Sequence, residues 1–293
     1  MTVAEAPLIA IVAAGEMGSA IGARLRSRGA RVITSLTGRS AASARRARDA
    51  GIEVVETYVE LMRAELFLSI VPPGRARELA EQLAPALAGA SNKPVFVDCN
   101  AVSVRTVASI AATIERAGAP FVDAGIIGGP PSERGTDGAC IYASGAHARA
   151  LAPLAAYGMR VRYLDGPIGQ ASALKMSYAA ITKGLIAIGS VAALGATRAG
   201  VVDALRTELR ESQPAIAPWL DRQLPTIARK AYRWIAEMHE IAEFLESPAS
   251  GETIYRGAAQ FYAHLAATNE DGNGGEAAEA IVQLDRFVQT QHA

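Results

Sequence analysis

The chain has 293 residues, of which 50% are hydrophobic and only 5% aromatic. This length fits two domains that each bury a core, and the low aromatic content favours close-packed helices and tight turns over a β-sandwich. Lysine plus arginine equals aspartate plus glutamate, at 29 each, so no excess charge favours a nucleic acid or an anionic membrane as a partner.

Short apolar runs alternate with helical patterns up to about residue 165. Apolar residues three and four positions apart predict helices over Met17–Arg28, Ser40–Ala50, Arg75–Ala88 and Val104–Gly118. Runs rich in Val and Ile predict strands over Leu8–Ala13, Arg31–Ser35, Leu66–Val71, Val95–Asp98, Phe121–Asp123, Ala139–Ala143 and Arg160–Leu164. This alternation predicts an α/β fold with a Rossmann-type, doubly wound and mainly parallel sheet.

The pattern changes after the sequence Asp165-Gly166-Pro167. No strand pattern follows, and an exposed loop is expected over residues 269–274. Helical patterns predict helices over 168–199, Val202–Glu211, Pro218–Met238, His239–Glu246, Glu252–Ala267 and Gly275–Gln291. We therefore expect a dinucleotide-binding Rossmann domain over residues 1–165 and an all-α substrate and dimerisation domain over residues 166–293.

The sequence favours a cytoplasmic protein. Cys99 and Cys140 lie far apart in apolar stretches, which is typical of buried thiols in a reducing compartment rather than of a disulfide. No signal-peptide pattern is present at the start of the chain. The most apolar stretch, Ala179–Leu194, carries Lys183 and several small residues, so we interpret it as a buried helix rather than a membrane span.

A phosphate-binding turn is predicted where the first strand meets the first helix. The turn comprises Ala14, Gly15, Glu16, Met17 and Gly18. Gly15 leaves space for a pyrophosphate beside the helix N-terminus, and Gly18 allows close packing of helix on sheet. The first glycine of the usual motif is replaced by alanine, so an ordinary turn between strand and helix is the alternative.

The end of the second strand favours NADP over NAD. NAD-binding folds place an acidic residue there to bind the ribose 2′-hydroxyl, and this segment has none. Arg39, with Ser40 and Thr37, is the candidate for binding a 2′-phosphate, because a guanidinium forms paired, charged hydrogen bonds with phosphate. The alternative is a solvated arginine preceding a helix N-cap.

Five segments in order resemble the 3-hydroxyacid dehydrogenase and 6-phosphogluconate dehydrogenase superfamily. The second half resembles its branch with a C-terminal domain of unknown function (DUF1932-type), through Thr37–Ser40, Ala180–Gly184 and Ala231–Ile241. The five segments are Gly15–Gly18, Ser69–Pro73, Asp98–Ser103, Asp123–Pro130 and Gly166–Lys175. The resemblance implies that Val71, Pro72 and Pro73 line the nicotinamide ribose, and that Asn100, Ala101, Gly128 and Gly129 contact the substrate or cofactor.

Lys175 takes the position of the catalytic lysine in this resemblance. A lysine beside an oxidised nicotinamide loses affinity for its proton and can then act as a general acid or base. The alternative is an ordinary solvated helix lysine.

The family often has Asn four residues after this lysine, where this chain has Ala179. The candidates for substrate contact in the second half are Tyr178, Thr182, Lys183 and Glu237. Lys183 could bind a substrate anion or extend from the edge of the core. Glu237 could face the site or be a surface carboxylate.

These features predict an NADP-dependent oxidoreductase that transfers a hydride between the cofactor and a small hydroxy acid, or a related alcohol or carbonyl compound. Two alternatives remain: an imine reductase, because the two families share this architecture, and a catalytically inactive NADPH-binding protein. No residue pattern indicates a metal site. By resemblance we expect a homodimer that forms through the helical domain, with no nucleic-acid or membrane partner.

Overall fold

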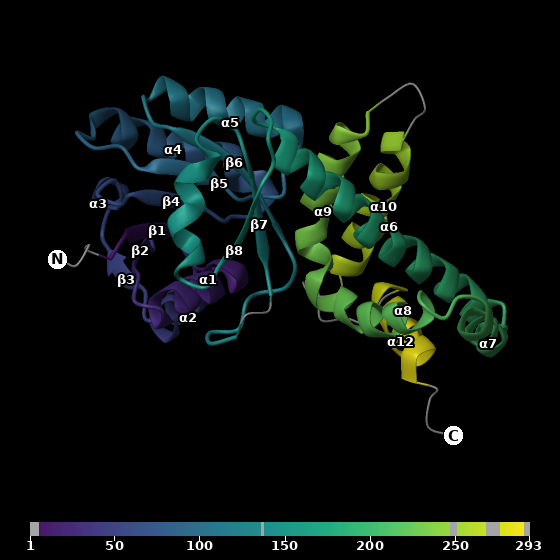
Figure 1. Ribbon diagram of the computed structural model, residues 1–293. Coiled ribbons are helices and arrows are strands. Elements are labelled where there is room, and N and C mark those ends of the chain that lie inside the picture. Colours follow the sequence, from purple (N-terminus) through teal and green to yellow (C-terminus); the bar gives the residue numbers. More distant parts are fainter. Residues whose placement is uncertain (1–5, 136–137, 247–250, 268–275, 290–293) are drawn as a thin grey trace. The chain divides into compact units, whose positions relative to one another are not determined.

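A computed structural model describes residues 6–135, 138–246, 251–267 and 276–289. Residues 1–176 and residues 177–293 form separate compact units, and each is described by itself (Figure 1). The sequence placed the boundary earlier, near residue 165, in the loop that precedes helix α6 (Gln170–Arg198). That helix begins in the first unit and continues into the second.

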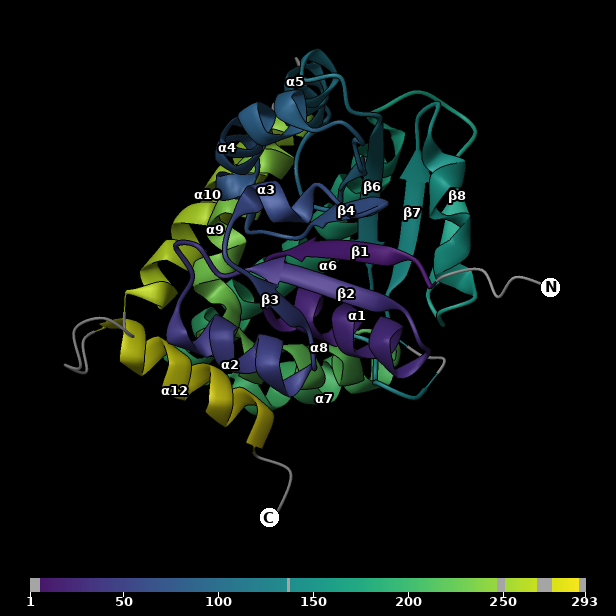
Figure 2. The ribbon, with the colours of Figure 1, turned by 90° about the vertical axis from the view of Figure 1, so that its left-hand side faces the viewer.

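The first unit is built around an eight-stranded sheet with the strand order β3-β2-β1-β4-β5-β6-β7-β8 (Figure 2). All neighbouring strands are parallel except β6 and β7, which are antiparallel. The strands are β1 (Leu8–Val12), β2 (Arg31–Ser35), β3 (Glu53–Val55), β4 (Leu66–Ser69), β5 (Val95–Asp98), β6 (Phe121–Ile127), β7 (Cys140–Ser144) and β8 (Arg160–Tyr163). The predicted Rossmann-type, mainly parallel sheet is confirmed.

Helices cover both faces of this sheet because its central strands are apolar on both sides. Along β1, Ala10 and Val12 pack into one buried cluster, and the alternate residues Ile9 and Ile11 pack into the other. The helical elements of this unit are α1 (Glu16–Ser27), α2 (Ala41–Asp49), α3 (Tyr58–Leu61), η1 (Pro73–Arg75), α4 (Ala76–Gly89), α5 (Val104–Arg116) and η2 (Ala148–Ala155).

Short polar residues determine where several of these helices begin. Ser40 caps α2 by accepting a hydrogen bond from the backbone N–H of Ser43, and Ser103 caps α5 in the same way. Helix α1 is different, since its N-cap residue is Gly15 and no side chain caps it. Its first backbone N–H groups therefore have no side-chain acceptor, which is the arrangement that an anion-binding helix terminus requires.

Helices are the one kind of regular secondary structure among the described residues of the second unit, as predicted. This unit comprises most of α6, followed by α7 (Val202–Ser212), α8 (Ala217–Gln223), η3 (Leu224–Thr226), α9 (Ile227–Phe244), α10 (Gly251–Ala266) and α12 (Glu276–Gln289). The buried ring of Trp234 packs edge-on against Tyr262, with ring centroids 5.1 Å apart, and this contact joins α9 to α10.

Two details of the helix prediction are wrong. The predicted break between Met238 and His239 is absent, because α9 continues to Phe244. The break lies earlier, at η3, where Pro225 lacks the backbone N–H that a continuous helix needs. The loop predicted over residues 269–274 lies outside the described residues.

Among the described residues, α6 is the one helix long and apolar enough to cross a bilayer on length and composition alone, and 44% of its most apolar window is buried within the protein.

Candidate functional site

The first part of the candidate site is the turn between β1 and α1. An added Cβ atom at Gly18 would overlap the carbonyl oxygen of Ala13, so only glycine fits this close approach of helix to strand. A Cβ added at Gly15 would meet no atom within 4 Å. The turn therefore leaves space beside an uncapped helix N-terminus, which suits a pyrophosphate group.

The end of β2 carries the predicted 2′-phosphate residues. Arg39 is half-buried, and its Nε is a buried atom with no hydrogen-bond partner. The hydroxyl of Thr37 lies 2.9 Å from that of Ser35 and donates to the carbonyl oxygen of Glu56 at 3.2 Å. An unsatisfied guanidinium N–H next to an N-terminal helix cap is a suitable donor for an anionic group.

Arg46 is a residue of this region that the sequence analysis missed. Its Nε donates to the carbonyl oxygen of Ala14 at 3.2 Å, and its terminal nitrogen donates to the Ser43 hydroxyl at 3.2 Å. A second guanidinium thus extends from α2 to the predicted phosphate turn. The signal available in the sequence was only its position, two helical turns after Ser40, in a helix with several other arginines.

Asn100 joins the ends of β4 and β5. Its side-chain oxygen accepts from the backbone N–H of Val71 at 2.7 Å, and its amide nitrogen donates to the Ser69 hydroxyl at 2.9 Å and to Asp98 at 3.0 Å. The residue is 2% exposed. Both amide hydrogens are therefore used within the protein, and the carbonyl retains one acceptor position. Direct contact of Asn100 with substrate or cofactor stays a prediction, as does contact by Ala101.

The neighbouring segment after Val71 turns sharply. Pro72 is exposed, and Pro73 is half-buried and begins the short helix η1. The backbone of Val71 is held by Asn100, so this segment is fixed at the edge of the sheet where the parallel strands end. That location is where ligands bind in open α/β sheets.

Asp123 fixes the helix that carries Lys175. The Asp123 carboxylate is fully buried and accepts from the backbone N–H groups of Gly169, Ala171 and Ser172 at 2.8, 3.0 and 3.2 Å. It also accepts from the hydroxyls of Ser144 and Ser172 at 2.9 and 2.7 Å. A carboxylate at a helix N-terminus satisfies its free donors and complements the helix dipole.

Lys175 lies about one turn further along α6, over strand β6. The approach is close, since a Cβ added at Gly125 would lie 2.9 Å from the Ala171 carbonyl oxygen and 3.0 Å from Lys175 Cβ. Lys175 itself is half-buried. The lysine is therefore held at a defined position at the end of the sheet by Gly125 and by the Asp123 cap.

The loop after β6 contains two predicted substrate contacts, Gly128 and Gly129. Both are exposed, and Gly128 has a φ of 114°, a conformation that residues with a side chain rarely adopt. Glycine at position 128 is thus required by the backbone. Substrate contact by either residue stays a prediction.

Two of the predicted residues of the second unit, Lys183 and Glu237, form a buried ion pair. Lys183 Nζ bonds to a carboxylate oxygen of Glu237, with side chains 17% and 8% exposed, and it lies 5.8 Å from the centre of the Trp234 ring. The hydroxyl of Tyr262 donates to the Lys183 carbonyl oxygen at 2.8 Å. Burial, and to a lesser degree the Glu237 charge, raises the pKa of Tyr262, so this hydroxyl remains a donor.

Tyr178 and Thr182 lie on the same helix as Lys183. Tyr178 is 46% exposed, and the hydroxyl of Thr182 donates to the Tyr178 carbonyl oxygen at 2.9 Å. Roles in substrate binding for these two residues, and for Lys183 and Glu237, stay predictions.

Cys99 is buried directly after the carboxyl end of β5 in the first unit. Burial raises the pKa of its thiol well above the usual value, and the carboxylates of Asp98 and Asp123 raise it further. The thiol therefore stays protonated at neutral pH, which does not suit a nucleophile.

The parallel sheet, the glycine turn and the polar strand ends define a dinucleotide-binding α/β protein. Residues 8–157 match the family model for the NAD binding domain of 6-phosphogluconate dehydrogenase, and residues 196–265 match a domain of unknown function, DUF1932. The chain therefore belongs to the family of NAD(P)-binding oxidoreductases defined by the NAD binding domain of 6-phosphogluconate dehydrogenase.

Three relatives illustrate the similarity. An uncharacterised 28.5 kDa protein of Methanothermus fervidus is 29% identical over 70% of this chain and 77% of its own. MTH1747, a conserved protein of unknown function with structural similarity to 3-hydroxyacid dehydrogenases, is 26% identical with a TM-score of 0.66, covering 94% of this chain and 99% of its own. The 3-hydroxyisobutyrate dehydrogenase of Mycobacterium tuberculosis has a TM-score of 0.68 at 19% identity, covering 98% and 100%. That likeness, like the likeness to imine reductases, shows the fold alone.

Proposed function

We propose that the protein is an NADP-dependent dehydrogenase or reductase that acts on a small hydroxy acid or a related alcohol or carbonyl compound. The observation that carries this proposal is the position of Lys175. Asp123 and Gly125 hold this lysine near the carboxyl ends of the parallel strands. The glycine turn at the start of α1 lies at this same end of the strands, because β1 and β6 run in the same direction.

The residues of the first unit fit NADP. The uncapped N-terminus of α1 and the open space at Gly15 suit the pyrophosphate. The unsatisfied Nε of Arg39 supports a role in binding the 2′-phosphate, and Arg46 adds a second positive charge near the turn. No acidic residue stands between Thr34 and Ser40 to favour the NAD ribose or to repel a phosphate.

Lys175 is proposed to move the proton of the reaction. The bound nicotinamide supplies or accepts the hydride. During oxidation the neutral amine of Lys175 accepts the proton of the substrate hydroxyl, and during reduction its ammonium donates a proton to the new alkoxide oxygen. The ammonium form of Lys175 would be disfavoured beside an oxidised, positively charged nicotinamide, so acceptance of the proton by Lys175 and reduction of the cofactor would support each other.

The principal test replaces Lys175 and measures binding and turnover separately. Lys175→Met should lower kcat about 10²–10⁴-fold, the range for loss of a general acid or base. The fluorescence of NADPH should still increase when the cofactor binds to this variant. Lys230→Met, which removes a lysine from the second unit, is the control and should retain activity. Full turnover by Lys175→Met would refute the assignment.

Cofactor choice is tested with Arg39 and Arg46. Arg39→Ala should weaken NADPH binding at least about tenfold and leave NADH binding unchanged, because only NADPH carries the 2′-phosphate. Arg46→Ala should show a smaller change in the same direction. Equal affinities of the native protein for NADPH and NADH would remove both arginines from this role.

One panel of substrates distinguishes the proposed dehydrogenase from two alternatives, an imine reductase and a catalytically inactive NADPH-binding protein. Hydroxy acids and cyclic imines, each assayed with NADP(H), distinguish a dehydrogenase from an imine reductase. Tight NADPH binding without turnover of either class, and without any effect of Lys175→Met, would instead support a catalytically inactive NADPH-binding protein.

A further inference from the structure

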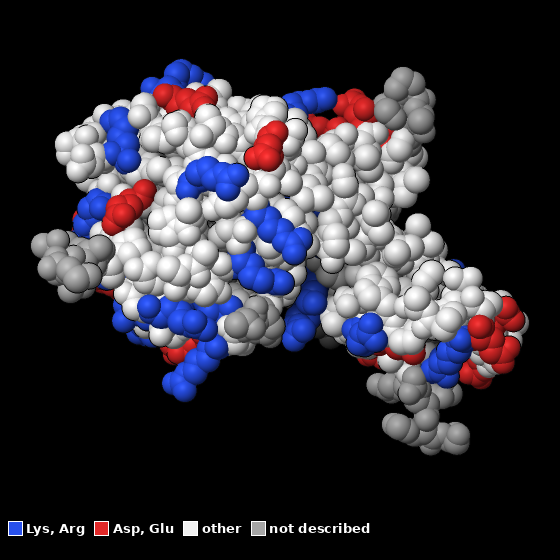
Figure 3. Space-filling model, in the orientation of Figure 1, with Lys and Arg blue, Asp and Glu red and all other residues white. Residues whose placement is uncertain are grey.

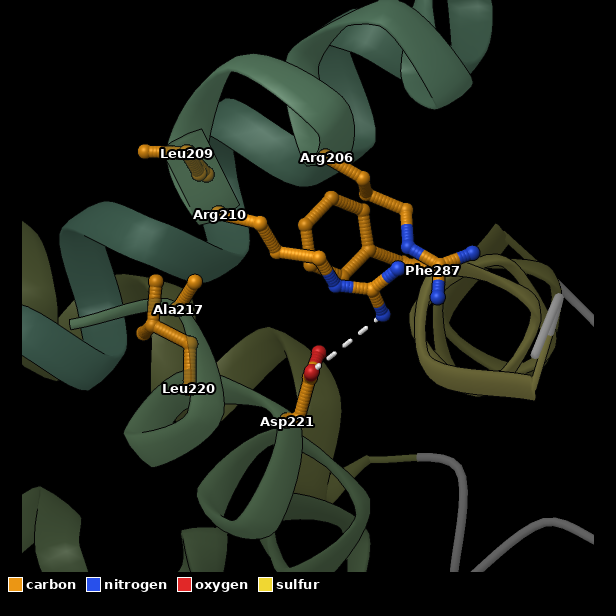
Figure 4. Close-up of a pocket in the computed structure, with 7 residues that line it drawn as sticks. All are labelled: Arg206, Leu209, Arg210, Ala217, Leu220, Asp221 and Phe287. Carbon is orange, nitrogen blue, oxygen red and sulfur yellow. Dashed lines mark ion pairs between the residues drawn. The ribbon is translucent and has the colours of Figure 1, made fainter. Parts of the chain in front are cut away.

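A small pocket in the second unit lies between helices α7, α8 and α12, and none of the residues that line it is assigned a role above (Figure 4). Its volume is about 10 Å³, close to the space that a single water-sized particle occupies. It is lined by Arg206, Leu209, Arg210, Ala217, Leu220, Asp221 and Phe287. Two cations and one carboxylate therefore line the pocket, which leaves an excess positive charge.

The excess charge resides on Arg206. This residue is 5% exposed and carries a positively charged guanidinium. One terminal nitrogen donates to the Val288 carbonyl oxygen at 3.4 Å, and the guanidinium carbon lies 5.7 Å from the centre of the Phe287 ring. Its Nε is buried without a hydrogen-bond partner. Within the described part of the chain, no carboxylate forms an ion pair with Arg206.

The pocket's carboxylate is already engaged. Asp221 on α8 pairs with Arg210 on α7 at 3.6 Å, as Figure 4 shows.

A comparison with Arg24 in the first unit shows how a buried arginine is satisfied by hydrogen-bond acceptors. Arg24 is 1% exposed, and its guanidinium donates to the carbonyl oxygens of Ser132 and Gly158. Arg206 lacks an equivalent set of acceptors, although a buried cation without a counter-charge is unfavourable.

We propose that this pocket binds one small, singly charged anion, such as chloride or the carboxylate of a short acid, with the Nε–H of Arg206 as a donor. The small volume of the pocket favours a single small ion over a larger group such as a complete phosphate. The bound anion would neutralise Arg206 and join α7, α8 and α12. Its effect would be on the stability of the second unit, separate from nucleotide binding in the first.

The test measures thermal unfolding of the full chain while sodium chloride, or separately sodium formate, replaces sodium methanesulfonate at constant ionic strength. Because a ligand bound only by the folded state stabilises it, Tm should rise by at least about 2 °C and then saturate. A bromide-soaked crystal should show anomalous scattering beside Arg206 Nε.

Arg206→Met supplies the decisive variant, because it keeps an unbranched apolar side chain and removes the charge. It should abolish the saturable response, and without chloride its Tm should equal or exceed that of the native chain. Arg222→Gln, at an exposed position on α8, is the matched control and should respond like the native chain.

If Arg206→Met does not fold, Arg210→Gln keeps the proposal testable. It frees the Asp221 carboxylate, cancels the excess positive charge and should weaken the response several-fold. A native chain that shows no saturable response to either anion, with only a water peak beside Arg206, would overturn the proposal. NADPH binding should be unchanged in every variant, so this result stands apart from the proposed enzyme activity.

Discussion

The two units bury charged groups in different ways. In the first unit, the buried carboxylate of Asp123 and the buried guanidinium of Arg24 bond mainly to backbone groups and hydroxyls. In the second unit, Lys183 and Glu237 satisfy each other through side chains on separate helices. Strand ends, loops and helix termini expose free backbone donors and acceptors, whereas the N–H groups in the interior of a helix are already used. A buried carboxylate in a helical unit therefore finds few backbone donors, and the Lys183 side chain supplies the donor for Glu237.

The largest effect is expected from Asp123→Ala, which tests the backbone-based arrangement. Three backbone N–H groups and two hydroxyls lose their acceptor, so the free energy of unfolding should fall by about 3–5 kcal/mol. Chemical denaturation measures the change. Asp165→Ala is the control, because that side chain is 93% exposed, and it should change stability by less than about 0.5 kcal/mol. A loss below 1 kcal/mol for Asp123→Ala would contradict the proposed role of the cap.

Lys183→Met tests the charge-paired arrangement and should cost about 3 kcal/mol, because Glu237 is left buried without its cation. The double variant Lys183→Met/Glu237→Leu should recover most of the loss, since apolar groups of similar volume replace a buried ion pair at little cost. Arg63→Ala breaks the exposed pair with Glu53 and should cost less than about 1 kcal/mol. If the double variant is no more stable than Lys183→Met, pairing is not the reason for the burial.

Substitutions at two glycines of the first unit should distinguish an effect on stability from an effect on cofactor binding. Gly18→Ala should lower the free energy of unfolding by about 1–3 kcal/mol, because its Cβ meets the Ala13 carbonyl. Gly15→Ala meets nothing in the protein and should leave stability unchanged, yet weaken NADPH binding about tenfold or more. Denaturation and fluorescence titration on the same samples distinguish the two. Normal NADPH affinity in Gly15→Ala would place the pyrophosphate elsewhere.

The smallest effect on folding is expected on the outer face of α6. Its apolar residues lie three or four positions apart and are 40–65% exposed: Tyr178, Ile181, Leu185, Ile188 and Val191. Figure 3 shows few charges along this part of the second unit. An apolar stripe of this kind can pack against a second copy of itself, as the proposed homodimer would require. Ile188→Glu should halve the mass in solution and change monomer stability by less than about 0.5 kcal/mol. A native chain that sediments as a monomer would refute the dimer.

The sequence predicted most of the first unit because most of its strands leave a local signal. Val95–Asp98 and Arg31–Ser35 agree with the observed strands to the residue, since buried parallel strands are short apolar runs with clear ends. Strand β3 was missed because it has three residues and two of them are exposed, so it has no apolar pattern. The antiparallel direction of β7 was also missed, because a strand pattern carries no direction.

The candidate site was predicted less completely, for a similar reason. The residues of the glycine turn and Lys175 belong to contiguous motifs. The hydrogen bonds of Asp123 extend over 21 to 49 residues, and the bond from Arg46 to Ala14 over 32, so neither contact has a local pattern. The same applies to Lys183 and Glu237, 54 residues apart, which the sequence singled out separately but did not pair.

The cap at the start of α6 has a consequence for how this architecture diversifies. One carboxylate on a central strand fixes the helix that carries Lys175, the residue proposed to transfer the proton, whatever connects the two elements along the chain. The loop that follows β6 can then change in length or composition while the lysine stays in register. Under the proposed function, exchanging that loop between relatives would change specificity without rebuilding the proposed site around Lys175.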